Sequence, residues 1–199
     1  MQLFLNKTSP FARLVAAALL EYNLPKPTLL WSDPWAFEPE LLAANPFSMV
    51  PALRHHEKNI YESLLIIRYL FHLQGRGEPI DSYPRYGYGK TLMETTFRHV
   101  SLKNNQPKES IPHPFIAITE RMLRNALTEL DNHLPSEYQE EHLPLCTLQL
   151  LIALDYIAFR LPHLYQEEIN PPLNATIAQA QSRASLHRTA PERFTQLTL

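Results

Sequence analysis

The sequence has little cysteine, little glycine and little net charge. Its one cysteine, Cys146, excludes an internal disulfide and a cysteine-rich metal site, and suits a reducing compartment. The four glycines, none before Gly75, leave most turns to the 18 prolines and to Asn, Asp and Ser. A formal net charge of −2 provides no basic field for nucleic acid or acidic lipid, so neither is an expected partner.

Long hydrophobic runs are also lacking. No apolar stretch approaches the roughly 18 residues that a membrane helix needs. The first five residues, MQLFL, are followed at once by polar residues 6–8, which is not the pattern of a signal peptide. With 199 residues, 45% of them hydrophobic, the chain can bury the core of one large domain or two small ones. We therefore expect a globular, cytoplasmic protein.

The first part of the chain alternates strands and helices. Residues 2–5 predict a buried strand, and Ser9 followed by Pro10 predicts the start of a helix that runs to about residue 23. A second strand is expected at residues 27–31. Because a strand, a helix and a strand follow one another within about 30 residues, these two strands should be parallel.

The next segment completes a small α/β domain. A short helix is expected over residues 38–44 and ends at Asn45 and Pro46. Residues 53–56 and 59–61 predict the two arms of a hairpin, and residues 62–73 predict a helix. The resulting order, βαβ-α-ββα over residues 1–75, is the thioredoxin-like arrangement.

The rest of the chain predicts helices only. All four glycines lie within residues 75–89 together with Pro79 and Pro84, so residues 76–89 are predicted to be a linker. Residues 90–199 are predicted to form an all-α C-terminal domain, with helices over 92–99, 115–134, 145–160 and 173–185. The expected fold class is therefore α/β plus all-α.

Three groups of residues in the first domain, taken in their order and spacing, resemble a known family. They are Ser9–Arg13 after the first strand, Asn45–Pro46 followed by Val50–Leu53, and Glu62–Ser63 followed by Ile66 and Tyr69–Leu70. This pattern resembles the cytosolic glutathione transferases, and more closely bacterial members of the serine type. The second half resembles the family's helical domain more loosely, through Leu154–Arg160 with Pro162 and Arg183–Ser185 with Thr189–Pro191.

The resemblance implies specific roles. The Val50–Pro51 bond would be cis, the main chain of Val50 would pair with the cysteinyl part of glutathione, and Glu62 and Ser63 would bind its γ-glutamyl end. Glutathione would be a co-substrate, with no metal, in a homodimeric enzyme. The reaction would be attack of the glutathione thiolate on a small electrophile, or a glutathione-dependent isomerisation or reduction.

Ser9 is the candidate catalytic residue. A hydroxyl at a helix N-terminus can donate to the glutathione sulfur and so favour its thiolate form. The alternative is that Ser9 only caps its helix, and Thr8 is a less favoured substitute. Related families carry a nucleophilic cysteine at this point, so a mechanism through a protein cysteine is not expected here.

The electrophile pocket would form between the two domains. Its candidate lining residues, each of which could equally be ordinary core, are Phe11, Trp35, Phe97, His99 and Tyr156. The pair Glu62–Ser63 also has a purely structural alternative, as an acidic helix start.

Three departures from the family pattern favour a second function, a non-catalytic binding or regulatory protein of the same fold. One is the shortened, proline-interrupted start of the helical domain. Met49 stands where many relatives have a lysine that would meet the glycine carboxylate of glutathione. Arg54 or His55 could compensate, or could simply be solvated. Helix 145–160 also lacks the usual Ser or Thr cap with an Asp three residues later, because Leu150 follows Thr147 at that spacing.

A metal site is not expected among the nine histidines. His55 and His56 are the only close pair, and neighbouring residues of a strand face opposite sides of the sheet.

Overall fold

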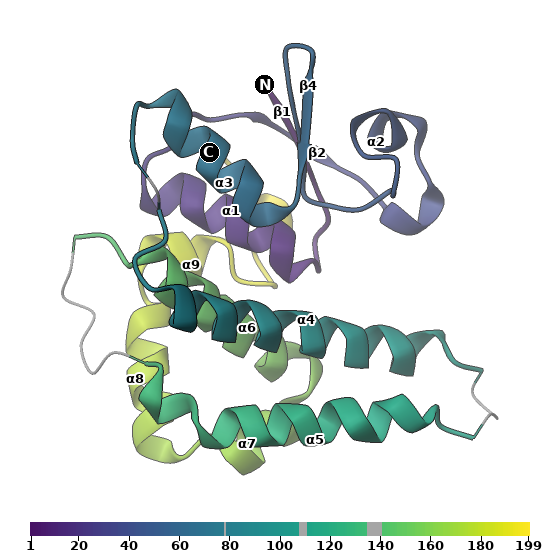
Figure 1. The fold of residues 1–199 in the computed structure, drawn as a ribbon, viewed down its shortest axis with the longest axis vertical. Coiled ribbons are helices and arrows are strands. Elements are labelled where there is room, and N and C mark those ends of the chain that lie inside the picture. Colours follow the sequence, from purple (N-terminus) through teal and green to yellow (C-terminus); the bar gives the residue numbers. More distant parts are fainter. Residues whose placement is uncertain (78, 108–110, 135–140) are drawn as a thin grey trace. The chain divides into compact units, whose positions relative to one another are not determined.

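The computed structural model describes residues 1–77, 79–107, 111–134 and 141–199. Their packing divides the chain into two compact units. The first consists of Met1–Asp81 together with Arg183–Leu199, and the second of Ser82–Ser182. Figure 1 shows a sheet with helices in the first unit and helices alone in the second, so the predicted fold class is confirmed.

The first unit contains a four-stranded sheet in the order β2-β1-β3-β4. Its strands are β1 (Gln2–Leu5), β2 (Thr28–Trp31), β3 (Ala52–His55) and β4 (Lys58–Tyr61). The pair β1 and β2 is parallel, as predicted, and the other two pairs are antiparallel. In the register, Ala52 lies opposite both Phe4 and Tyr61. The ends of β1, β2 and β4 and the start of β3 therefore share one edge of the sheet.

Helices enclose this sheet. The helices α1 (Pro10–Glu21) and α3 (Ser63–Leu73) pack against each other and against β1 and β3. The short α2 (Pro39–Ala44) packs with Phe4 and Ala52 in a second buried cluster that includes Leu30 and Val50. Pro10 and Pro39 stand at the first helical position, where a missing N–H costs no hydrogen bond.

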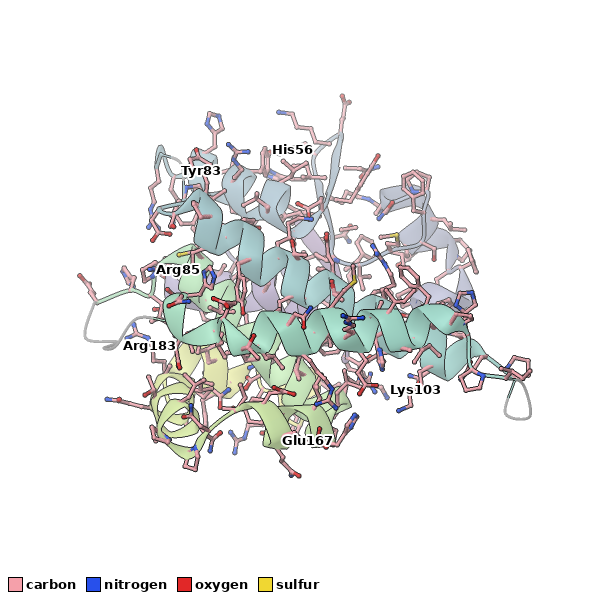
Figure 2. The ribbon with its side chains drawn as sticks, turned by 60° about the horizontal axis from the view of Figure 1, so that its bottom comes forward. His56, Tyr83, Arg85, Lys103, Glu167 and Arg183 are labelled. Carbon is pink, nitrogen blue, oxygen red and sulfur yellow. The ribbon has the colours of Figure 1, made fainter. Side chains whose placement is uncertain are left out.

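The C-terminal segment returns to the first unit. The helix α9 (Ala184–Arg188) packs on α1, and Arg183, labelled in Figure 2, donates to the Glu21 carboxylate at 2.7 Å. In the 3-10 turn Phe194–Gln196, the ring of Phe194 meets the ring of Trp31 edge-on at 5.2 Å. Residues 183–199, which the sequence analysis includes in the helical domain, thus pack within the unit that holds the sheet.

In its described residues the second unit contains helices and no strand. Its helices are α4 (Tyr83–Asn105), α5 (Pro114–Thr128), α6 (Leu145–Arg160), α7 (Pro162–Glu168) and α8 (Pro171–Gln181), with a 3-10 turn at Leu130–Asn132. The bounds predicted for α6 are confirmed. This helix is buried on nearly all sides and begins after Pro144 without a side-chain cap, while Thr147 lies inside its first turn.

The other predicted helices of this half differ from the observed ones. Residues 83–89 of the expected linker form the first turns of α4, which also extends beyond the predicted 92–99. The helix expected at 115–134 ends at Thr128. The one expected at 173–185 is divided, because α8 begins earlier, with Asn170 as its cap, and ends before Arg183.

A close approach between helices explains why a glycine-rich stretch is helical. A Cβ atom on Gly89 would lie 3.3 Å from both the Cα and the backbone nitrogen of Leu150 in α6. A Cβ atom on Gly87, by contrast, would have nothing within 4 Å of it. Gly89 therefore allows α4 to pack directly against the main chain of α6.

In the substitution Gly89→Ala, the added methyl group presses on the backbone of a buried helix, which is expected to cost about 1–3 kcal/mol. Because alanine contributes roughly 0.8–1 kcal/mol within a helix, the expected net effect is a destabilisation of up to about 2 kcal/mol. The matched control Gly87→Ala should be stabilising by the alanine contribution alone. Urea unfolding followed by circular dichroism measures both, and equal effects of the two substitutions would contradict the prediction.

Among the described residues, no single helix has the length and hydropathy of a membrane span. The helices α6 and α7 reach that measure only when taken together, and they are bent by 118° at the break between them.

Candidate functional site

Three of the predicted site elements meet at one edge of the sheet. The helix α1 starts just after the end of β1, Val50 and Pro51 directly precede β3, and α3 starts just after the end of β4. The strand register places these three points at the same edge. The starts of α1 and α3, which are the positive ends of their dipoles, therefore lie on either side of the chain at Val50.

Ser9 caps α1 and keeps its hydroxyl proton available. Its Oγ accepts a hydrogen bond from the N–H of Ala12 at 3.2 Å, and its side chain is half-buried. Within the described chain, the Ser9 hydroxyl itself donates to no other group. Capping uses only an oxygen lone pair, so the two roles considered for Ser9 are compatible.

Thr8 differs from Ser9 in this respect. The Thr8 hydroxyl lies 3.1 Å from Oδ1 of Asn6, to which it donates, and the Thr8 N–H binds the same oxygen at 3.0 Å. The donor that Thr8 could offer to a ligand is thus already used. Of the two neighbouring hydroxyls, the one on Ser9 can still donate a hydrogen bond to a ligand.

The chain before β3 is held so that the main chain of Val50 stays unpaired. The Val50–Pro51 bond is cis, as the resemblance implied. Buried Asn45 organises the preceding loop: its Nδ2 donates to the Met49 carbonyl at 2.9 Å, and its Oδ1 accepts from the Phe47 N–H at 3.1 Å. In the described part of the chain, no hydrogen bond uses the N–H or the C=O of Val50, which are free to pair with another peptide.

In the sequence, Asn45 is recognisable only as a turn residue and a motif position. Its role in holding the Met49 carbonyl was missed, since a side chain that reaches four residues along its own loop leaves no periodic signal.

The start of α3 combines a carboxylate with helix N–H groups. Glu62 has a positive φ of 81°, an uncommon conformation for a residue with a side chain, which is often found at functional sites. Its carboxylate is exposed and accepts from the Leu64 N–H at 3.0 Å and from the Ser63 hydroxyl at 3.4 Å. Ser63 itself is only 3% exposed, so most of the surface that this helix start offers comes from the exposed Glu62.

Arg54 and His55, the two side chains considered as replacements for the lysine, both have partners within the first unit. Arg54 donates to the Glu40 carbonyl at 3.2 Å, and its guanidinium lies 5.5 Å from the centre of the Phe4 ring. His55 forms a 2.9 Å hydrogen bond with the Tyr69 hydroxyl on α3. Burial, and then the neighbouring His56, lower the pKa of His55, which favours the neutral ring. Met49 is 61% exposed and carries no charge.

The expectation that His55 and His56 point apart is wrong. His56 lies in the hairpin turn with a φ of 53°, not in the strand, and the two ring centroids are 4.3 Å apart (Figure 2 labels His56). Strand alternation therefore does not apply to this pair. Even so, no group of three His, Cys, Asp or Glu side chains in the described ranges is placed to hold a metal ion.

The residues proposed for the electrophile pocket lie in both units. Phe11 is half-buried on α1, and Trp35 is 68% exposed in the 3-10 turn Pro34–Ala36 of the first unit. His99 belongs to α4 of the second unit, where it is 2% exposed and its Nδ1 lies 3.0 Å from the Thr119 hydroxyl. Burial lowers the pKa of His99. A side chain this deeply buried offers a ligand almost no surface, and the shared pocket stays a prediction.

Comparisons with known proteins agree on this architecture. Residues 8–73 match the family model described as "Glutathione S-transferase, N-terminal domain". No curated protein matches the sequence.

Solved structures extend the likeness to nearly the whole chain. A glutathione transferase family member from Pseudomonas fluorescens Pf-5 with bound glutathione is similar with a TM-score of 0.82 at 24% identity, over 96% of this chain and 98% of that one. A glutathione S-transferase from Methylobacillus flagellatus with bound glutathione is similar with a TM-score of 0.76 at 20% identity, over 96% and 98%. At these identities the likeness concerns the fold.

Proposed function

Because this chain has the glutathione transferase fold, with a glutathione S-transferase N-terminal domain at residues 8–73, we propose that it binds glutathione and promotes attack of the glutathione thiolate on a small electrophile. A glutathione-dependent isomerisation or reduction would use the same thiolate. The family supplies the expectation, and the geometry of the sheet edge supports it residue by residue.

The observation that carries this proposal is the unpaired main chain of Val50 between two helix starts. An extended peptide laid along Val50 would form backbone hydrogen bonds to its N–H and C=O, as an added strand does at a sheet edge. Such pairing recognises a peptide without regard to its side chains. It therefore suits the cysteinyl residue in the middle of glutathione, whose side chain must remain free to react.

The start of α3 suits the γ-glutamyl end of the peptide. That end carries both an ammonium and a carboxylate group. The exposed Glu62 carboxylate can accept from the ammonium, and the first N–H groups of α3 can donate to the carboxylate. The Ser63 hydroxyl would join them only by turning from Glu62, to which it donates at a long 3.4 Å. Adjacent acidic and donor groups thus match a zwitterion, whereas a simple anion would be repelled by Glu62.

Ser9 supplies the chemistry. With the peptide held between Val50 and Glu62, its thiol would lie at the start of α1, where the Ser9 hydroxyl can donate to sulfur. This hydrogen bond and the helix dipole both favour the thiolate, so they lower the thiol pKa toward neutral pH. The protein would otherwise contribute mainly proximity to the electrophile.

Two further features belong to this proposal, namely a homodimeric state and a cytoplasmic location. The exposed rings of Phe47 and Tyr61 support an association surface, since they lie together with centroids 6.2 Å apart and are 68% and 40% exposed.

A second candidate function, a binding or regulatory protein of the same fold, is favoured by one specific observation. The side chains that could replace the missing lysine, Arg54 and His55, are engaged elsewhere. A weakened glutathione site is what a protein that no longer uses the thiol would retain.

Titration calorimetry with glutathione distinguishes these functions. We expect binding, and we expect Glu62→Gln to raise the Kd about tenfold or more, because a charge-assisted hydrogen bond contributes about 1.5–3 kcal/mol. Glutamine retains an oxygen that can cap Leu64, so α3 should stay intact. The matched control is Glu57→Gln in the exposed hairpin turn, which should leave the Kd unchanged. Absence of binding at millimolar glutathione would leave only the second function.

A further inference from the structure

A stretch beside the proposed site contains no basic residue. Residues 27–53 have no Lys, Arg or His, but contain three acids, Asp33, Glu38 and Glu40. This stretch includes β2, the 3-10 turn at Pro34–Ala36, α2 and the loop that ends at Val50. At neutral pH it therefore carries a formal charge of −3.

The order of the strands places this stretch at one end of the bound peptide. In the sheet β2-β1-β3-β4, the γ-glutamyl end would lie at the start of α3 beyond β4, and the cysteinyl residue beside Val50 at the start of β3. The third residue then extends away from β4, toward the end of β2. The loops there are joined by hydrogen bonds from the Ser32 N–H to the Leu5 carbonyl and from the Ser48 hydroxyl to the Pro34 carbonyl, both 2.8 Å.

The side chains on this stretch are apolar or acidic where they are exposed. The large exposed apolar residues, each at least 60% exposed, are Trp35, Phe37, Phe47 and Met49. Asp33 and Glu40 are also exposed, and Asp33 accepts from the Trp35 N–H at 3.0 Å. A carboxylate on the third residue of the peptide would meet rings, a thioether and two like charges. A neutral or positively charged group would meet no such opposition.

Three basic residues of the first unit follow β1 or begin just after the stretch, and each could in principle reach the third residue of the peptide. Arg54 donates to the Glu40 carbonyl and lies over the Phe4 ring, which holds its guanidinium against this stretch; its positive charge offsets one of the three acids and leaves the stretch net acidic. Arg13 is 3% exposed and donates to the Leu186 carbonyl at 3.3 Å. Lys7, in the turn between β1 and α1, is exposed and is the one that could reach a carboxylate from the side of Ser9.

We infer that the thiol preferred by this site is a γ-glutamyl peptide whose third residue carries an amide in place of a free carboxylate. This inference rests on the proposed function, because it assumes that the peptide lies along Val50. It names the chemical class of the co-substrate: a glutathione capped at its glycyl end, with a neutral or basic group in that position. Met49 is the specificity-determining residue, since a lysine at this position would supply a positive charge for the glycyl carboxylate.

The test compares glutathione with glutathione amide, which has nearly the same shape but no glycyl charge. By titration calorimetry at about 20 mM salt, we expect the amide to bind about two- to fivefold more tightly. At about 0.5 M salt the two affinities should converge, because the repulsion is screened. Met49→Lys should reverse the preference, and the uncharged control Met49→Leu should leave it unchanged.

Other outcomes would overturn the inference. Tighter binding of glutathione than of its amide by the unaltered protein would do so. If Lys7→Gln then removed that preference, Lys7 would be identified as the carboxylate partner. If the protein bound neither peptide, the proposed function itself would be overturned. If it bound glutathione tightly but not the amide, the proposed function would stand and only this inference would be wrong.

Discussion

Replacing Ser9 with glycine is expected to lower turnover about 100-fold, the usual effect of losing one hydrogen-bond donor to a developing or stabilised anion. The pKa of the bound glutathione thiol should rise by about one to two units, because the hydroxyl no longer donates to sulfur. Glycine is chosen because it is tolerated at an N-cap at a cost of only a few tenths of a kcal/mol. The change therefore separates the hydroxyl's role in chemistry from its role in capping α1.

The thiol pKa is measured from the ultraviolet absorbance of the bound thiolate as a function of pH. Turnover is measured with an aromatic electrophile. The matched control is Thr8→Ala, which removes the neighbouring hydroxyl that already donates to Asn6. It should alter neither quantity. An unchanged thiol pKa in the glycine variant would exclude Ser9 from the mechanism and leave it only its place as a helix cap.

The second large effect concerns stability. Arg183→Ala is expected to destabilise the first unit by about 3 kcal/mol, the low end of the usual cost of removing one partner of a buried ion pair, because the Arg183 side chain is 22% exposed. The side chain of Glu21 is only 4% exposed, lies 2.7 Å from Arg183, and also accepts from the Ser185 hydroxyl. Without the guanidinium, the buried Glu21 carboxylate would lose the positive charge that faces it at 2.7 Å.

Both tryptophans, Trp31 and Trp35, belong to the first unit, so urea unfolding followed by their fluorescence reports on that unit. The matched control is Arg193→Ala, an exposed arginine of the same segment, which should change stability by no more than about 0.5 kcal/mol. The double variant Glu21→Leu with Arg183→Met should recover most of the loss, because it removes both charges together. An unfolding midpoint for Arg183→Ala equal to that of the unaltered protein would show that the pair contributes little.

Local chemistry predicted the elements that begin with a clear signal. The helix α1 begins at Pro10 after its Ser9 cap, β1 covers Gln2–Leu5, and α6 has the predicted bounds because its apolar run has no competing interpretation. Where the signal was composition alone, the prediction was wrong. The glycines at residues 75–89 predicted a linker that ends near residue 89. Gly89 instead lies within α4, where the absence of a side chain lets the main chain of α6 pack closely.

For the site, the order of residues alone was enough to place a hydroxyl and an acid at two helix starts and a proline before a strand, and to show a long stretch without basic residues. Packing supplied the rest. The register that gathers these points at one edge, the unpaired main chain of Val50, and the return of Arg183 to Glu21 all depend on hydrogen bonds between residues far apart in the chain. Helix caps and periodicity act over a few residues, so they contain no information about which distant partners remain unpaired.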